Sequence, residues 1–249
     1  MHTAVLLLFP TVNVIVTALF AGMVLRQYRQ RRHPYQLYWS IGLLMALGAT
    51  LAYVFMIVVQ PTTSLGTFLF RLYYILGAAL VPAWLGLGSI ALISKARLTY
   101  ICLTSLYLLS AAAAMLIFLA SINVRALSHV VGTTGTGVLV PGPWLVAIIT
   151  LNTLGVVAVV GVAIYSGWQL LRRQASIGGL STKNILWANV LILGGDLLNA
   201  AAGSLARFFN FDIAFWLIMA VGWVVFFIGV VFASRRSLKK EREENKYAR

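Results

Sequence analysis

Long runs of apolar residues alternate with short polar connections along the whole chain. A membrane-spanning helix needs about 20 mostly apolar residues. Seven runs reach that length, and they are Ala4–Leu25, Tyr35–Val59, Phe68–Ile93, Leu98–Ile122, Trp144–Leu171, Ile185–Ala206 and Ile213–Ala233. Their residues are apolar at consecutive positions, whereas the strands of a membrane β-barrel alternate apolar and polar positions. The pattern therefore predicts an all-α integral membrane protein, a bundle of seven transmembrane helices.

The composition agrees with this prediction. Charged residues make up 10% of the 249-residue chain, whereas a soluble domain has about 25%. The connections are too short to hold a further domain, so we expect one transmembrane domain over residues 1–233 and a charged cytoplasmic tail over residues 234–249. Lys239 and Glu243 lie four residues apart, as do Lys240 and Glu244. Such pairs predict that the last helix continues into the tail.

Basic residues gather at alternate ends of the predicted helices. Of the 19 Lys and Arg residues, all but Arg71, Arg125 and Arg207 come after an odd-numbered helix. Cytoplasmic connections carry such an excess. We therefore expect the N-terminus outside and the C-terminus inside, in the plasma or inner cell membrane. The basic face is expected to contact anionic lipid headgroups, and nucleic acid is not an expected partner.

The connection Asn123–Pro143 is the longest outside the predicted helices. It contains Gly-Thr-Thr-Gly-Thr-Gly followed by Pro-Gly-Pro, a composition typical of turns. Two interpretations are open, a cover over a cavity that opens outward and an inert connector. His129, the one histidine in the segment, is expected to be solvated.

The three helices before the fourth and the three after it have features in common. Asn13 in the first helix matches Asn152 in the fifth, and Trp84 in the third matches Trp223 in the seventh. These matches suggest a weak 3+1+3 parallel repeat, similar in outline to the sugar-efflux SWEET transporters. Those proteins rely on prolines in four helices, whereas here only Pro82 lies mid-membrane. A retinal Schiff base of the rhodopsin-like kind is excluded because Ile213–Ala233 contains no lysine.

The sixth predicted helix carries a polar stripe on one side. Asp196, Asn199, Gly203 and Arg207 follow Asn189 at offsets of 7, 10, 14 and 18 residues, which fall along one line at 3.6 residues per turn. Asp196 lies near the middle, where an ionised carboxylate costs ~2.5–3.5 kcal/mol. We therefore expect Asp196 to face the bundle interior or a wet cavity.

Two interpretations of Asp196 have equal weight. In the first it holds a proton, a cation or a cationic ligand. In the second it bonds to Asn13, Asn152 or Asn199 and ties helices together, which contributes only ~0.6 kcal/mol on average.

Aromatic and basic side chains give further candidates. Trp84, with Pro82 and glycines beside it, predicts a kinked third helix with an opened backbone. Arg71 and Arg207 lie at the outward ends of the third and sixth helices, where they pair with Asp212 or lipid phosphate, or line an outer vestibule. The cavity candidates are Asp196, Asn199, Asn189, Asn13, Asn152, Trp84, Trp223 and Tyr74.

Residues for several chemistries are missing. His2, His33 and His129 lie outside the predicted helices, so no histidine pair can hold a haem in the bilayer. The single Cys102 excludes an internal disulfide, and no catalytic motif is found. We expect no enzyme activity, no metal and no cofactor.

The sequence favours a membrane protein that binds or transports a small molecule or ion. The alternatives are a non-catalytic accessory or scaffold subunit of a larger membrane complex, and a ligand-sensing receptor that acts through a partner. Expected partners are membrane lipids, a small-molecule ligand, and a membrane protein or a second copy of the chain.

Overall fold

The computed structural model describes residues 2–174, 182–209 and 212–247; within 7–233, side chains are described except at 170–171, 173–186, 207–208 and 210–213. Its elements are α1 (His2–Arg31), α2 (Pro34–Val58), α3 (Ser64–Tyr73), the π-helix η1 (Tyr74–Leu80), α4 (Val81–Ile93), α5 (Ala96–Leu119), α6 (Val124–Ser128), α7 (Pro143–Gln174), α8 (Thr182–Phe209) and α9 (Asp212–Tyr247).

The prediction of seven membrane-length helices is confirmed for the described residues. Each of α1, α2, α5, α7, α8 and α9 contains one such span, and α3, η1 and α4 together form another, Ser64–Ile93. This span begins four residues before the expected Phe68 because Thr63 caps it, its side chain accepting a hydrogen bond from the Gly66 N–H at 3.0 Å. The helix α9 runs on to Tyr247, as the spacing of charges in the tail predicts.

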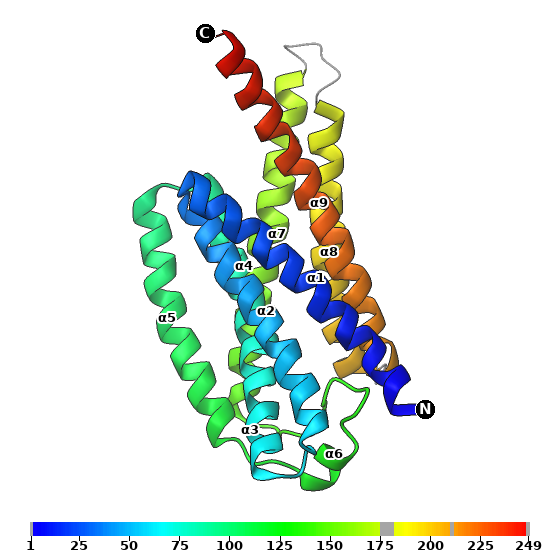
Figure 1. Ribbon diagram of the computed structural model, residues 1–249. Helices are drawn as coiled ribbons and strands as arrows, with labels where there is room; N and C mark the ends of the chain where they lie inside the picture. Colours follow the sequence, from blue (N-terminus) through cyan, green and yellow to red (C-terminus); the bar gives the residue numbers. More distant parts are fainter. Residues whose placement is uncertain (1, 175–181, 210–211, 248–249) are drawn as a thin grey trace.

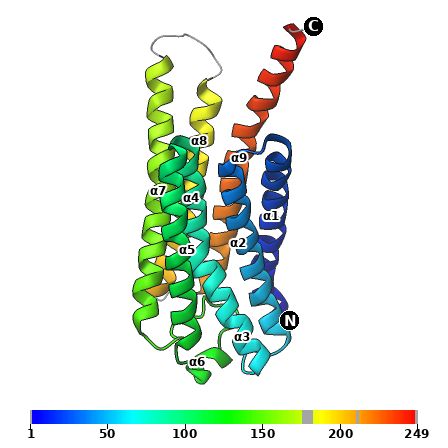
Figure 2. The same cartoon turned by 90° about the vertical axis from the view of Figure 1, so that its left-hand side faces the viewer.

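Six of these spans form a ring in which they follow one another in the order of the chain, with the α5 span left out. The order around the ring is α1, α2, α3–α4, α7, α8 and α9, and α9 packs against α1 to close it. The helix α5 lies outside the ring, against α4 and α7 (Figures 1 and 2). The two ends of the chain lie at opposite ends of the bundle (Figure 1).

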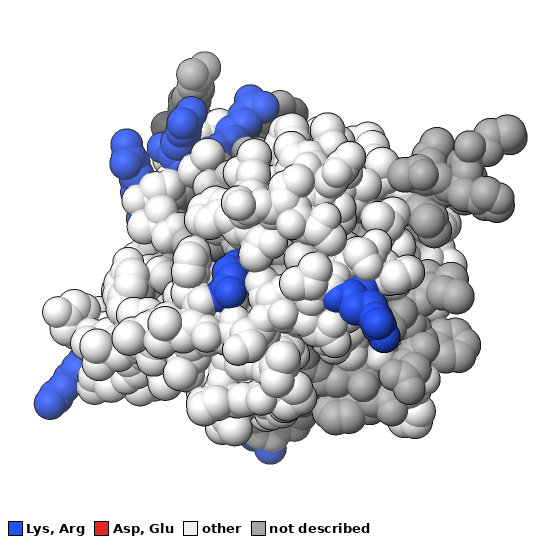
Figure 3. All heavy atoms as spheres, turned by 90° about the horizontal axis from the view of Figure 1, so that it is seen from below, with Lys and Arg blue, Asp and Glu red and all other residues white. Residues whose placement is uncertain are grey.

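The two ends of the ring differ in charge. The basic end holds the α1–α2 and α4–α5 turns, with Arg29, Arg31 and Lys95. The loop end holds residues 120–142. Viewed from the loop end, the described surface shows only scattered Lys and Arg side chains (Figure 3).

Close backbone contacts hold neighbouring helices of the ring together. A Cβ on Gly155 of α7 would lie 2.3 Å from the carbonyl group of Pro82, and one on Gly86 would lie 2.9 Å from the Gly155 Cα. Between α8 and α9, a Cβ on Gly195 would lie 2.5 Å from the Phe226 nitrogen. Small residues let helix backbones approach closely within a membrane.

The loop end is folded, not open. Asn123 caps α6 by accepting a hydrogen bond from the Ala126 N–H at 3.2 Å, and the chain then returns so that Ile122 and Leu139 form a single antiparallel bridge. Gly135 has φ +77° and packs over Phe70, where a Cβ would lie 2.5 Å from the ring. Only glycine fits this position, because it needs both a positive φ and no side chain.

Candidate ligand cavity

The inside of the ring holds a cavity of about 470 Å³, a volume within the range of ligand pockets. Its wall is built by α2, the α3–η1–α4 span, α7, α8 and α9, and by two threonines of the loop end, Thr134 and Thr136. The described helices of the first and last parts of the chain therefore face each other across it.

Asp196 and Asn199 of α8 lie in this wall. Asp196 is 6% exposed, and its Oδ2 atom has no hydrogen-bond partner among the described residues. The Oδ1 atom of Asn199 is likewise buried without a partner, and the amide packs against Gly222 of α9. Two acceptor atoms, one turn apart on one helix, thus lack donors. Unpaired buried acceptors are rare in folded proteins and call for an explanation.

Aromatic side chains form the wall around the loop end of the cavity. Tyr73, Tyr74, Phe215 and Trp216 line it there, and the Trp216 ring lies 6.1 Å from that of Tyr73 and 5.0 Å from that of Phe215. Trp223 lines the cavity two turns further along α9. The wall is thus largely apolar and aromatic, with few polar groups.

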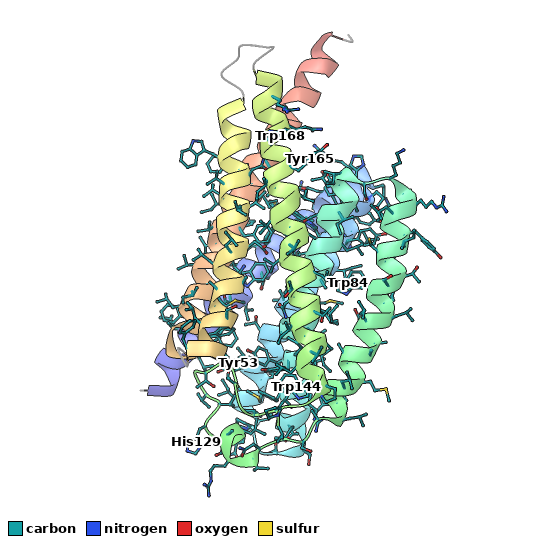
Figure 4. The ribbon with its side chains drawn as sticks, turned by 180° about the vertical axis from the view of Figure 1, so that it is seen from behind. Tyr53, Trp84, His129, Trp144, Tyr165 and Trp168 are labelled. Atoms are coloured by element: carbon teal, nitrogen blue, oxygen red, sulfur yellow. The ribbon has the colours of Figure 1, made fainter. Side chains whose placement is uncertain are left out.

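Residues 130–136 cover the loop end of the cavity and are held by three aromatic side chains. The Tyr53 hydroxyl donates to the Val130 carbonyl at 3.2 Å and accepts from the Gly132 N–H at 2.8 Å. The Tyr73 hydroxyl donates to the Thr134 carbonyl, and the Trp216 Nε1–H donates to the Thr133 carbonyl, both at 3.2 Å. These contacts favour the cover over the inert connector, since α2, α3 and α9 all bind the segment. Figure 4 shows Tyr53 beside it.

A second aromatic cluster closes the cavity toward the basic end. Phe226 lies 6.1 Å from Trp223, 5.3 Å from Phe20 and 5.8 Å from Trp39, as measured between ring centroids. These side chains come from α9, α1 and α2 and are packed with Leu43 and Val159 in one buried cluster. The cavity therefore lies between a hydrogen-bonded cover and an apolar plug.

The structure brings several of the predicted candidates together at the cavity. Asp196, Asn199, Asn152, Trp223 and Tyr74 all line it. The Asn152 amide nitrogen donates to the carbonyls of Ala78 and Ile148, so its role includes support of the backbone. Asp196 makes no hydrogen bond to Asn13, Asn152 or Asn199, so the described contacts give no support to the tie between helices.

Other predicted candidates lie elsewhere. Asn189 donates to the Ser166 Oγ atom at 3.4 Å, between α8 and α7 near the basic end. Asn13 is buried in α1 outside the cavity wall, without side-chain partners among the described residues. Trp84 points toward α5, with its ring 5.5 Å from that of Tyr107 (Figure 4).

Arg71 does not face the cavity. Its guanidinium donates to the Ile117 carbonyl at 3.0 Å and to the Ala120 carbonyl at 3.1 Å, at the end of α5. A cation at a helix C-terminus satisfies carbonyl groups that have no helical partner. The side chain of Arg207, the other vestibule candidate, is outside the described set.

Several lining residues escaped the sequence analysis. Thr50, Thr153 and Trp216 carry polar groups in the wall, and none of the three is among the predicted cavity candidates. A threonine in a membrane helix commonly bonds to its own backbone, as Thr50 does to the Ala46 carbonyl. No local signal separates such a residue from one that faces a cavity.

Comparisons with protein-family models, with curated proteins and with solved structures found no match. The cavity therefore has to be interpreted from its own chemistry.

Proposed function

We propose that this multi-pass membrane protein binds a small molecule or ion in the cavity and moves it across the membrane. The observation that carries the proposal is the buried carboxyl of Asp196, whose Oδ2 atom has no partner among the described residues and which lines a cavity of about 470 Å³. A carboxylate at membrane depth is costly and serves function by default.

Transport ranks ahead of ligand sensing because the cavity lies between two closures. The cover, residues 130–136, is held by hydrogen bonds from Tyr53, Tyr73 and Trp216. The plug at the other end is built from Trp223 and Phe226. A central site with a barrier on each side is what alternating access requires. Trp216 and Trp223 belong to the same helix, so a tilt of α9 would act on both barriers.

We also propose that the N-terminus lies outside and the C-terminus inside, and that the spans form a 3+1+3 repeat. The order of helices around the ring supports the repeat, since α1, α2 and α4 follow one another as α7, α8 and α9 do. The surroundings of the matched residues differ, however. Trp84 packs against Tyr107 of α5, whereas its counterpart Trp223 lines the cavity. Any repeat therefore extends to the arrangement of helices and not to their side-chain contacts.

Cysteine labelling tests whether the cavity admits small molecules. In a Cys102→Ser background, Thr50→Cys places a thiol in the wall, and Ala113→Cys places one in the packed interior, where the residue is 0% exposed. We expect neutral methyl methanethiosulfonate to modify the first in the full-length protein in vesicles and to leave the second unmodified. Equal, slow modification of both would refute an accessible cavity.

The side from which the reagent acts separates transport from sensing. In oriented vesicles, a membrane-impermeant cationic methanethiosulfonate should modify Thr50→Cys from either side if the cavity opens alternately. Modification from one side alone would favour a sensor. If neither reagent reaches the thiol and mild extraction yields a stable complex with another membrane protein, the accessory-subunit alternative gains instead.

A further inference from the structure

We infer that the ligand is an amphipathic organic cation, an ammonium group on an apolar body, and that it enters sideways from the bilayer between α7 and α8. This inference rests on the proposed function and adds the class of ligand and its path.

The charge of the ligand follows from the acceptors in the wall. Asp196 and Asn199 line the cavity, and their Oδ2 and Oδ1 atoms are buried without donors among the described residues. None of the described lining residues is a Lys or Arg. An ammonium group supplies the opposite charge and up to three N–H donors. Buried charges are tolerated when they are paired and hydrogen-bonded. An ammonium group would therefore supply the donors that these two acceptor atoms lack among the described residues. An anion would meet a carboxylate with no described cation to offset it.

The rest of the wall selects an organic cation over a metal ion. Indole faces attract cations within ~6 Å, and Trp216 and Trp223 both line the cavity. The remaining wall includes Val81, Leu85, Ile148 and Val156, which suit an apolar body. Hard metal ions need about six or more oxygen ligands. Among the described residues, no three His, Cys, Asp or Glu side chains group together.

The path of the ligand follows from which lining residues are also exposed. Val157 is 63% exposed and Ile149 is 45% exposed, yet both line the cavity from α7. On α8, Gly203 and Ser204 also line it and are exposed. Exposure on the two facing helices means that the cavity opens between them, through the side of the bundle.

The two helices separate toward the loop end. They meet near the basic end, where Asn189 contacts Ser166, and diverge from there (Figure 4). Because the cover and the aromatic plug close the two aqueous ends, the slot between α7 and α8 is the opening that the described residues provide. It lies at the depth of the hydrocarbon, where an apolar body is soluble.

Photolabelling in lipid nanodiscs tests the ligand class. The probe is decylamine carrying a diazirine, and the control is the alcohol of the same chain. We expect the amine to label cavity-lining peptides of α7, α8 and α9, and unlabelled decylamine but not decanol to compete. Asp196→Asn should reduce this labelling about tenfold, which corresponds to ~1.4 kcal/mol of binding. Thermal unfolding with each compound gives a second readout.

Paired glycine variants test the path. A Cβ on Gly203 or on Gly161 meets no heavy atom within 4 Å, so both positions accept a larger side chain without a clash. Gly203 lines the slot, whereas Gly161 of α7 is exposed outside the cavity wall. Gly203→Phe should slow cavity labelling several-fold, and Gly161→Phe should leave it unchanged.

The outcomes separate the inference from the proposed function. If amine and alcohol label the cavity equally and Asp196→Asn has no effect, the cationic ligand is refuted while a binding cavity remains. If Gly203→Phe and Gly161→Phe behave alike, the side path is refuted. If neither probe labels the cavity and methyl methanethiosulfonate fails to reach Thr50→Cys, the proposed function fails as well.

Discussion

The side-chain amide of Asn152 in α7 donates a hydrogen bond to the backbone carbonyl of Ala78 in the π-helix η1. In a regular α-helix this carbonyl would accept from the N–H of residue 82, but Pro82 has none. The backbone here widens instead, and the Val81 N–H reaches back five residues to the Leu76 carbonyl. Asn152 thus supplies a donor that the proline removes, so the opened third span and the asparagine form one unit.

Replacing Asn152 should therefore cost more when Pro82 is present. We expect Asn152→Ala to lower the free energy of unfolding by ~1–2 kcal/mol, because the Ala78 carbonyl loses its donor in a setting without water. In a Pro82→Ala background the restored N–H of residue 82 can donate to the Ala78 carbonyl instead. Asn152→Ala should then lower the free energy of unfolding by clearly less. A double-mutant cycle on unfolding in mixed micelles measures the difference. Strict additivity of the two changes would show that they are independent.

The contact between Gly155 and Pro82 makes a second prediction. Gly155→Ala should destabilise the protein by ~1–3 kcal/mol, because the added Cβ would lie 2.3 Å from the Pro82 backbone. Gly161→Ala, six residues further along α7 with open space around it, should be neutral or stabilise by ~0.5–1 kcal/mol. Thermal unfolding of both variants makes the comparison. Equal effects would mean that α4 and α7 do not cross here.

The cover over the cavity should loosen when Tyr53 loses its hydroxyl. Tyr53→Phe removes the hydrogen bonds to Val130 and Gly132 while it keeps the ring packed 4.4 Å from that of Trp216. We expect faster amide hydrogen exchange at residues 130–136 and a loss of ~1–3 kcal/mol in stability. Tyr107→Phe in α5, where the tyrosine is 56% exposed, is the control. Unchanged exchange would argue that packing alone holds the segment.

Arg71 should stabilise the end of α5. Arg71→Met removes two charged hydrogen bonds to the Ile117 and Ala120 carbonyls, with an expected cost of ~1–3 kcal/mol. Faster hydrogen exchange at residues 116–122 would locate the effect. Arg97→Met, an exposed residue in the first turn of α5, should change stability by less than ~0.5 kcal/mol. If Arg97→Met lowers stability as much as Arg71→Met does, positive charge near α5 matters and the hydrogen bonds to the carbonyls do not.

The sequence was sufficient for the features that depend on local pattern. Apolar runs of the right length predicted the seven spans, and the position of Pro82 predicted the opened backbone. The burial of Asp196 followed from the cost of a charge in the bilayer, since that cost is independent of the fold. These inferences needed only spacing and solvation.

The features that depend on distant neighbours were not accessible in this way. The partners Asn152 and Ala78 are 74 residues apart, and Arg71 reaches a helix 46 residues away. Trp84 and Trp223 have similar local settings, yet α5 packs outside the ring and buries the first away from the cavity. A periodic pattern identifies the buried face of a helix but not the helix that covers it.

The circular order of the helices also bears on how the protein is made. The spans of the ring follow the order of the chain, so each span can pack against the one made before it. The exception is α5, which packs outside the ring against α4 and α7. The contact between α9 and α1 joins the last span of the ring to the first, so it forms only after the other spans of the ring have been made. Until then the cavity that Asp196 lines lacks the wall that α9 provides.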